Sequence, residues 1–128
     1  MKTNIKKSLL FAFTVMILTV LTVFSVSAKT VTKNKLVYEI NEKTATLVEC
    51  KSNAKKIKVP SKVNGYKVTA IGKWAFSGRS RLESVELPST LTRIGKAAFN
   101  ECTSLVEIYI PITVGTMGGG VFQACLKT

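Results

Sequence analysis

The sequence predicts a short solenoid in which one unit of about 23 residues repeats and stacks into about three rungs of β-strand. Residues 71–88 align with residues 94–111, so that an Ile-Gly pair and an Ala-Phe pair both recur. Each aligned segment ends in a short apolar strand followed by proline. A unit of this length cannot bury its apolar face alone, so we expect the units to stack on one another.

The strands are predicted just before Pro60, Pro88 and Pro111. Proline offers no backbone N–H and fixes its own φ angle, so it belongs at the end of a strand rather than inside a sheet. The inward side chains follow the Leu-x-x-Leu-x-Leu spacing of a leucine-rich repeat and are Leu82, Val85, Leu87, Leu105, Ile108 and Ile110. We therefore predict a leucine-rich-repeat solenoid whose parallel strands return through turns or short helical segments.

The return path of each unit is expected to insert one aromatic ring into the core. Phe76, Phe99 and Phe122 follow one another at the constant spacing of the repeat. Stacked units place equivalent side chains one above the other. The sequence thus predicts a column of three phenylalanine rings.

A β-hairpin is predicted ahead of the first rung. Between residues 35 and 50, apolar residues alternate on both sides of residues 41–43, which is the pattern of a half-buried hairpin. The first rung follows and ends at Pro60. The spacing from Pro60 to Pro88 is five residues longer than the spacing from Pro88 to Pro111. We assign the five extra residues to the turn at Asn64-Gly65, where an insertion leaves the stacked core in register.

The N-terminal segment, residues 1–28, is predicted to form a signal peptide helix. Three lysines precede an apolar run at residues 9–26, and the small residues that follow fit cleavage between Ala28 and Lys29. An uncleaved anchor is the alternative, because the run is long enough to cross a bilayer. The expected organisation is a signal peptide at 1–28, the hairpin and first rung at 29–63, and the repeats at 64–128.

The part of the chain that follows Ala28 is strongly basic. It holds 16 of the 19 basic residues and all seven acidic ones, a net charge of +9, and such a charge attracts anionic partners. Lysines crowd residues 51–62, which favours a solvated basic face; binding of an anionic wall polymer is the alternative. No aromatic residue or arginine lies among these lysines, so specific nucleic-acid binding is not expected.

The composition excludes most catalytic sites. The chain contains no histidine and no aspartate. Histidine-dependent triads, histidine zinc sites and aspartate-rich metal loops are therefore excluded. No G-x-x-x-x-G-K-[ST] phosphate loop occurs either. We expect a non-catalytic protein without cofactor or metal.

Two of the three cysteines share a column of the predicted stack. Cys102 and Cys125 are separated by one repeat, and adjacent rungs lie about 4.8 Å apart, within the Cα separation that a disulfide spans. Parallel side chains strain the disulfide torsion, whereas buried thiols pack well. We favour two stacked free thiols, with a disulfide as the alternative. Cys50 is expected to pack at a strand end, with a reactive thiol as the alternative.

The outward face of the strands supplies the candidate partner-binding residues. Alignment of the strands places them in two rows, which are Lys58, Glu86 and Tyr109, and Lys56, Ser84 and Glu107. Unlike charges within a row can pair across rungs, and an outward tyrosine belongs to a residue type enriched at interfaces. Solvation of a sheet surface is the alternative interpretation of both rows.

One complete repeat resembles a known family. The matching residues are Ile94, Gly95, Ala98, Phe99, Cys102, Leu105, Ile108, Ile110 and Pro111. They fit the BspA-type leucine-rich repeat of many bacterial surface proteins, and the hairpin resembles that family's lead-in. The resemblance implies a leucine-rich-repeat solenoid, a secreted or cell-surface location, and adhesion or protein binding. It carries over no catalytic residue.

The sequence departs from this pattern at both ends of the repeats. Arg79 stands where the cysteine column would begin, and the chain stops before a further Leu-x-x-Ile strand. A remnant of a longer surface protein is therefore a further alternative. The last rung lacks a polar cap, so we expect poor coverage and self-association at the C-terminal end. The residues expected to be poorly covered are Met117, Val121, Phe122 and Leu126.

Overall fold

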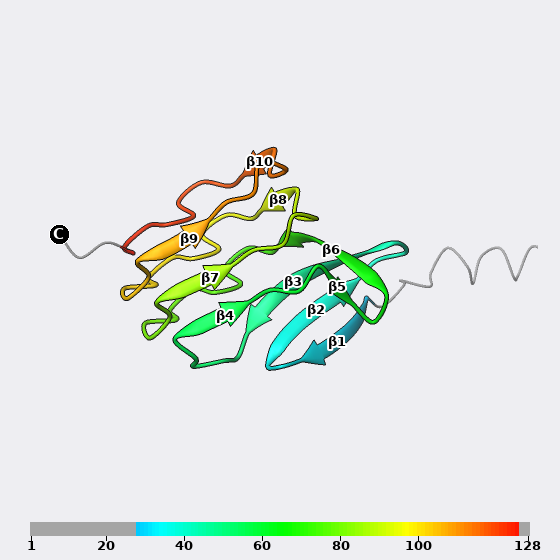
Figure 1. Cartoon of the computed structure of the whole chain (residues 1–128), viewed down its shortest axis with the longest axis horizontal. Helices are drawn as coiled ribbons and strands as arrows, with labels where there is room; N and C mark the ends of the chain where they lie inside the picture. The colour runs from blue at the N-terminus through cyan, green and yellow to red at the C-terminus, as the bar shows by residue number, and fades with distance from the viewer. Residues whose placement is uncertain (1–27, 126–128) are drawn as a thin grey trace, which may run out of the picture.

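The computed structural model describes residues 28–125, and this part of the chain folds into β-strands and turns without a helix. Seven strands form sheet A and three form sheet B (Figure 1). The strands of sheet A are β1 (Lys29–Lys33), β2 (Leu36–Ile40), β3 (Thr44–Cys50), β5 (Lys62–Val63), β6 (Tyr66–Ile71), β8 (Arg93–Ile94) and β10 (Thr116–Met117). The strands of sheet B are β4 (Lys56–Lys58), β7 (Ser84–Glu86) and β9 (Glu107–Tyr109).

Sheet B contains the three predicted rungs. β4 pairs in parallel with β7, and β7 with β9, in the order β4-β7-β9. The register runs through Ile57, Val85 and Ile108, as the alignment of the repeats predicted. The leucine-rich-repeat solenoid is thereby confirmed, although its return path within the described residues consists of turns and short strands rather than helices.

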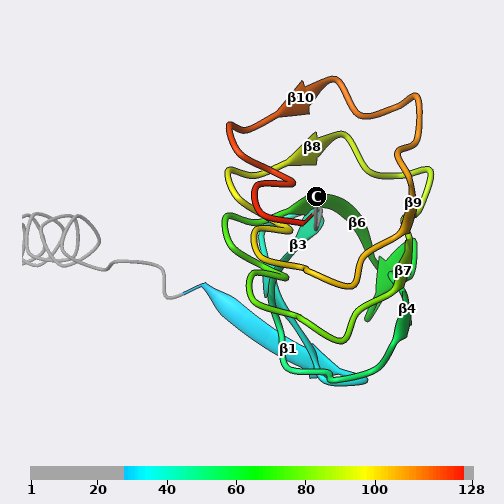
Figure 2. The ribbon, with the colours of Figure 1, turned by 90° about the vertical axis from the view of Figure 1, so that its left-hand side faces the viewer.

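A second parallel array closes the coil on the other side. β6, β8 and β10 pair through Ile71, Ile94 and Met117. Figure 2 shows β8 and β10 on one side of the coil and β7 and β9 on the other. The sequence did not predict these strands, because β8 and β10 are two residues long and a period of two cannot be recognised over that length.

The N-terminal strands extend sheet A. β1 pairs antiparallel with β2, and β2 pairs antiparallel with β3 on either side of residues 41–43. β3 then pairs in parallel with β6, with Leu47 opposite Ile71. These strands therefore cover the first rung at the N-terminal end of the coil. β1 was not anticipated from the sequence, since four of its five residues are exposed and lack an apolar alternation.

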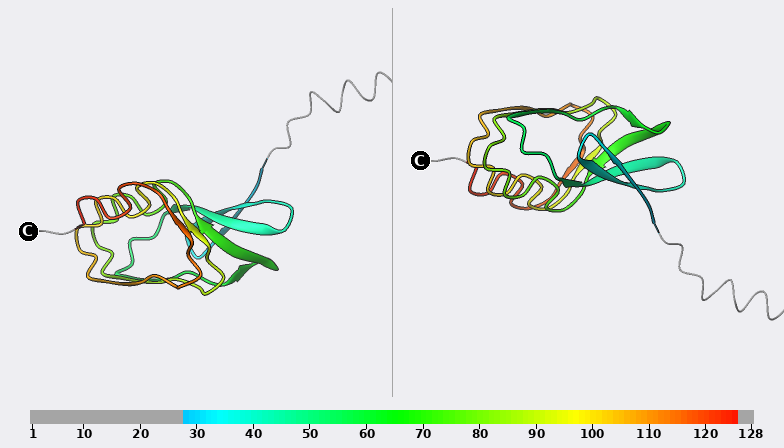
Figure 3. Two further views of the ribbon diagram at one scale, coloured as in Figure 1. Left: turned by 90° about the horizontal axis from the view of Figure 1, so that it is seen from above. Right: turned by 90° about the horizontal axis from the view of Figure 1, so that it is seen from below.

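The five-residue insertion forms a small hairpin. β5 pairs antiparallel with β6 through Val63 and Tyr66. The two residues between them have positive φ angles, 48° at Asn64 and 84° at Gly65, as a two-residue hairpin turn with the right twist requires. The turn predicted at Asn64-Gly65 is confirmed. In Figure 3 this hairpin and the β2–β3 pair project from the same side of the coil.

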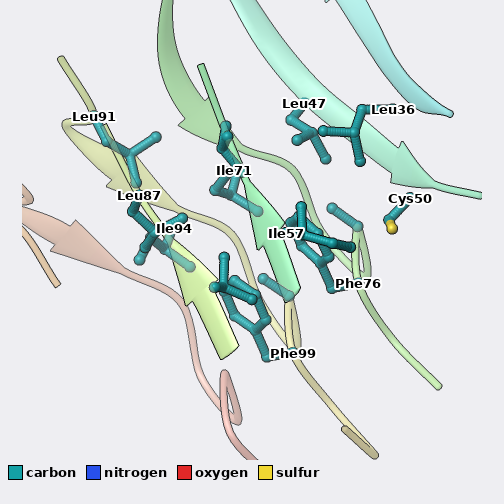
Figure 4. Packing of buried hydrophobic residues seen from close by; sticks show 14 of the residues in the cluster. Leu36, Leu47, Cys50, Ile57, Ile71, Phe76, Leu87, Leu91, Ile94 and Phe99 are labelled. Carbon is teal, nitrogen blue, oxygen red and sulfur yellow. The ribbon is translucent and has the colours of Figure 1, made fainter. Parts of the chain in front are cut away.

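The phenylalanine rings form the predicted column through the core. The rings of Phe76 and Phe99 stack with centroids 4.8 Å apart, and those of Phe99 and Phe122 with centroids 5.7 Å apart. Phe76 and Phe99 lie among the branched aliphatic side chains of both sheets (Figure 4). Both rings are fully buried, whereas the ring of Phe122 is 36% exposed.

Coverage of the C-terminal end follows the prediction only in part. Met117 and Phe122 are exposed as expected. The expectation for Val121 was wrong, because its side chain is buried. Val121 occupies the position of Ala75 and Ala98, which are also buried, so its side chain is enclosed within its own rung. The expectation for Leu126 lies outside the described residues.

The predicted signal peptide also lies outside the described residues, except for Ala28. Within residues 28–125 no helix has the length and apolar character that crossing a membrane requires. β1 begins at Lys29, the residue after the predicted cleavage site, and Ala28 and Lys29 are both exposed.

Candidate binding surface

The outer face of sheet B brings all six predicted partner-binding residues together. The sheet register aligns Lys56, Ser84 and Glu107 in one row. The other row, Lys58, Glu86 and Tyr109, lies two residues further along the strands. Because alternate side chains point to opposite faces, the row between them points into the core and holds the strands in place. We call this surface the sheet B face.

Ion pairs link neighbouring rungs beside and on the sheet B face. The Lys58 ammonium lies 2.8 Å from the Glu86 carboxylate, as the row predicted, and the Lys55 ammonium lies 3.0 Å from the Glu83 carboxylate. Both pairs are largely exposed to solvent, so each contributes little to stability. These ion pairs instead lower the positive charge of the surface, because they neutralise two lysines of the basic cluster.

The last rung of the sheet B face exposes Glu107 together with large apolar and aromatic side chains at and around β9. Tyr109 is 75% exposed, and Val106 and Ile112 are 86% and 98% exposed. Residues 108–125 contain no charged side chain, although the chain as a whole has a net charge of +12. The sequence indicated Tyr109 alone. Val106 and Ile112 were missed because they flank the strand, where the alternation of inward and outward side chains no longer applies.

The side chains of Cys102 and Cys125 contribute to packing within the described structure. All three cysteines are free and buried, in agreement with the favoured interpretation. The Cys102 thiol donates to the carbonyl oxygen of Phe76 at 3.0 Å, and the Cys125 thiol donates to that of Phe99 at 2.7 Å. Each thiol thus contacts the preceding rung as a small apolar group with a weak donor.

Burial decides the protonation of these thiols. Burial, followed by the proximity of Cys125, raises the pKa of Cys102 to about 11. Burial also raises the pKa of Cys50, whose thiol donates to the Ser52 carbonyl oxygen at 3.7 Å. A nucleophilic cysteine needs a lowered pKa and access to solvent. The alternative of a reactive Cys50 is therefore unsupported.

Arg79 interrupts the cysteine column at the first rung. Its Nε is buried and has no hydrogen-bond partner among the described residues. No group of three histidine, cysteine, aspartate or glutamate residues in the described part of the chain is arranged to hold a metal ion.

A polar hollow of about 400 Å³ lies across the outer side of β8 and β10. No motif indicated this hollow, because its lining comes from three rungs. The lining residues are Thr69, Ala70, Thr92, Arg93, Thr113, Gly115 and Thr116. The Thr92 hydroxyl donates to the Thr69 carbonyl oxygen and is thereby committed to holding adjacent rungs together.

Comparison with known proteins identifies the repeat. The BspA type leucine rich repeat region matches residues 25–128, in six copies. No curated protein shows significant sequence similarity to the chain.

Several solved structures share the fold. A leucine rich repeat protein of T. pallidum has a TM-score of 0.70 and 23% identity, over 78% of this chain and 50% of that chain. A leucine rich cell surface protein from Faecalibacterium prausnitzii A2-165 has a TM-score of 0.70 and 31% identity, over 81% of this chain and 31% of that chain. A leucine-rich repeat protein from Bacteroides capillosus ATCC 29799 has a TM-score of 0.56 and 27% identity, over 77% and 95% of the two chains.

The chain matches half or less of the length of the first two of these proteins. The family match, by contrast, covers most of the present chain and includes every rung of both sheets. The chain therefore belongs to the BspA-type leucine-rich-repeat family.

Proposed function

We propose that this protein is exported and acts as a non-catalytic recognition module that binds a protein or glycan at the cell surface through the sheet B face. The exposure of Tyr109, with Val106 and Ile112 also exposed before and after the same strand, is the observation that carries the proposal. The cell-surface description of the F. prausnitzii protein supports the location.

The composition of the sheet B face suits recognition. Tyr109 offers an apolar ring and a hydroxyl, which can pack against a protein side chain or a sugar ring while making a hydrogen bond. The other members of the two rows add two ammonium groups, a hydroxyl and two carboxylates on rigid strands. An exposed aromatic residue next to polar groups on fixed strands is typical of interfaces in which a few side chains supply most of the affinity.

Tyr109→Ala tests the proposal. The full chain and this variant are applied to an array of glycans and of purified extracellular proteins, with Trp74→Ala as the matched control, because Trp74 is another exposed aromatic residue. We expect Tyr109→Ala to lose the ligands that the unaltered chain binds and Trp74→Ala to keep them. The reverse result would place recognition away from sheet B.

The second candidate is binding of an anionic wall polymer through the lysines of residues 51–62. Ion pairs with Glu49, Glu83 and Glu86 partly neutralise this cluster, which favours the first candidate. Polymer binding would weaken steeply with salt and disappear in a variant with Lys55, Lys56 and Lys58 changed to alanine. Binding that depends on Tyr109 and only weakly on salt supports recognition by the sheet B face.

Export is tested separately at the predicted cleavage site. A fusion to a reporter that is active only outside the cytoplasm should be active. Changing Val26 and Ala28 together to aspartate should block processing, because a signal peptidase requires small residues there. An unchanged mature mass in this double variant would show that cleavage does not occur after Ala28.

A further inference from the structure

The polar hollow on the outer side of sheet A has the size of a site for a small ligand. Its volume is about 400 Å³, and its lining comes from β6, β8 and β10 and from the residues just before β8 and β10. Small-molecule sites occupy roughly 300–1,000 Å³. Figure 2 shows β8 and β10 across the coil from β7 and β9, so the hollow is separate from the sheet B face.

The hollow exists because small residues form its floor. The sheet register places Ala70, Arg93 and Thr116 in one row across three strands. Ala70 contributes only a methyl group and is buried, so the neighbouring side chains rise above it. Gly115 contributes no side chain, and a β-carbon at this position would meet no atom within 4 Å. The floor is therefore low on the rungs before and after Arg93.

The hollow opens away from the sheet and not along the stack of rungs. Side chains of a sheet project out of its plane, whereas neighbouring strands are added within that plane. A further strand beside β10 would therefore lengthen the hollow and leave its opening in place.

Arg93 is the one charged residue among those that line the hollow. Within residues 28–125 its guanidinium forms no ion pair. The segments that contribute β6, β8 and β10, residues 66–73, 89–96 and 112–119, contain no acidic residue. Their basic residues are all exposed and are Lys67, Lys73, Arg93 and Lys96. This side of the coil therefore attracts anions, and Arg93 is the cation that an anion in the hollow meets.

The side chains of the hollow suit a carboxylate that also carries hydroxyl groups. A guanidinium binds a carboxylate through two parallel hydrogen bonds. The other polar side chains of the lining are threonines, whose hydroxyls both donate and accept. The Thr92 hydroxyl donates to the Thr69 carbonyl oxygen at 3.1 Å, so its oxygen is left to accept from a ligand. The hydroxyls of Thr113 and Thr116 form no hydrogen bond with another residue of the described range.

We propose that this hollow binds a sugar acid, a small ligand with one carboxylate and several hydroxyl groups. The carboxylate pairs with Arg93, and the hydroxyls bond to the threonines of the neighbouring rungs. The site is independent of the sheet B face and of the lysines of residues 51–62. A contact of this size is weak, with a dissociation constant on the order of millimolar, so it is measured in solution and not on a washed array.

The probe is glucuronate, titrated into the full chain and followed by amide chemical shifts. We expect shift changes at Thr92, Arg93, Gly115 and Thr116. Two matched ligands separate the contributions. The methyl ester of glucuronate keeps the hydroxyls and removes the charge, whereas acetate keeps the carboxylate and removes the hydroxyls. Each should bind at least about ten-fold more weakly than glucuronate.

Three variants make the test specific to the hollow. Arg93→Gln should weaken glucuronate binding at least about ten-fold, and Arg93→Lys should recover only part of this loss, because it restores the charge but not the planar fork. Arg81→Gln is the matched control, since Arg81 is an exposed arginine outside the hollow.

Gly115→Val tests the space itself. The added side chain fills the floor of the hollow, so we expect it to abolish glucuronate binding. The fold should be retained, because a β-carbon at Gly115 meets no atom and its φ angle is not in the positive range. The melting temperature of this variant checks that the fold is intact.

Several results would overturn the proposal. Shift changes that are absent well above millimolar glucuronate, or that appear at residues 51–62 instead, would show that the hollow is not the site. Equal weakening in Arg93→Gln and Arg81→Gln would indicate general attraction by a basic surface. Equal affinities for glucuronate and acetate would show that the threonines take no part. Full binding by Arg93→Lys would rule out the paired hydrogen bonds, and full binding by Gly115→Val would place the ligand outside the hollow.

Discussion

A β-carbon on Gly95 would lie 2.6 Å from the backbone nitrogen of Lys73, one rung earlier. A β-carbon on Gly118 would meet the backbone of Lys96 in the same way. The φ angle of Gly95 is not in the positive range, so close approach of two backbones, rather than an unusual conformation, requires glycine here. The Ile-Gly pair of the repeat therefore sets how closely the rungs of sheet A pack.

Gly95→Ala is expected to destabilise the fold by about 1 to 3 kcal/mol, because the methyl group meets backbone atoms that cannot move without separating the rungs. Gly115→Ala is the matched control, since a β-carbon at Gly115 would have no atom within 4 Å. The free energies of unfolding of both variants in urea provide the comparison. Equal stabilities would show that the rungs can separate without cost.

Phe99→Ala is expected to lower stability by about 3 to 5 kcal/mol, the range for loss of a buried aromatic side chain. Phe122→Ala should cost clearly less, because its ring is 36% exposed and stacks on one neighbour, whereas Phe99 stacks on two. The two melting temperatures test this order. Equal decreases in melting temperature would contradict the interpretation that the phenylalanine column forms the centre of the core.

Thr90 ties the inserted hairpin to the following rung. Its hydroxyl donates to the carbonyl oxygen of Val68 at 2.7 Å and approaches that of Ser61 at 3.4 Å. Thr90→Val keeps the shape and removes the donor, so we expect a loss of about 1 kcal/mol. Thr113→Val, at an exposed position, should change the free energy of unfolding by less. A neutral Thr90→Val would show that the hairpin is held by other contacts.

The parts of the fold that were predicted are those governed by stacking. A constant offset places equivalent residues in one column, so the register of Val85 with Ile108 and the stacking of Phe76 on Phe99 both followed from counting residues. The Asn64-Gly65 turn was predicted for a local reason, since these residue types tolerate positive φ angles.

The parts that were missed depend on contacts between distant segments. β8 and β10 are too short for an alternating pattern, and their strand geometry comes from pairing with β6. Val121 was misjudged because exposure was inferred from its position in the last rung, whereas its direction within the rung decides its burial.

The sequence predicted which residues line up on the candidate binding surface, but it did not predict how many of the lysines there are neutralised by ion pairs. Counting offsets placed Lys58 beside Glu86, and the structure pairs them. The pairing of Lys55 with Glu83 was not foreseen, because both residues precede the strands. The cysteine column was assigned to packing, but the bond from the Cys102 thiol to the Phe76 carbonyl oxygen required coordinates.

Alkaline pH should destabilise the fold through buried acidic groups, among which Cys102 and Tyr38 have the largest pKa shifts. Burial raises the pKa of Cys102 from 9.0 to about 11, and burial together with the proximity of Cys50 raises that of Tyr38 from 10.0 to about 12. The unfolded chain releases these protons at lower pH than the folded chain does, so the folded state loses stability as pH rises. Stability should be complete below pH 9 and should fall through pH 11 to 12.

Urea unfolding at a series of pH values measures this loss. Cys102→Ala removes one of these titrating groups, so the stability of the variant should be lower at neutral pH but should fall less steeply above pH 9. Alkylation by iodoacetamide gives an independent measure, because only the thiolate reacts. Cys102 should resist alkylation at pH 9 in the folded chain and react readily in urea. Rapid alkylation under native conditions, or a free energy of unfolding that stays constant up to pH 11, would show that the column opens to solvent without unfolding of the coil.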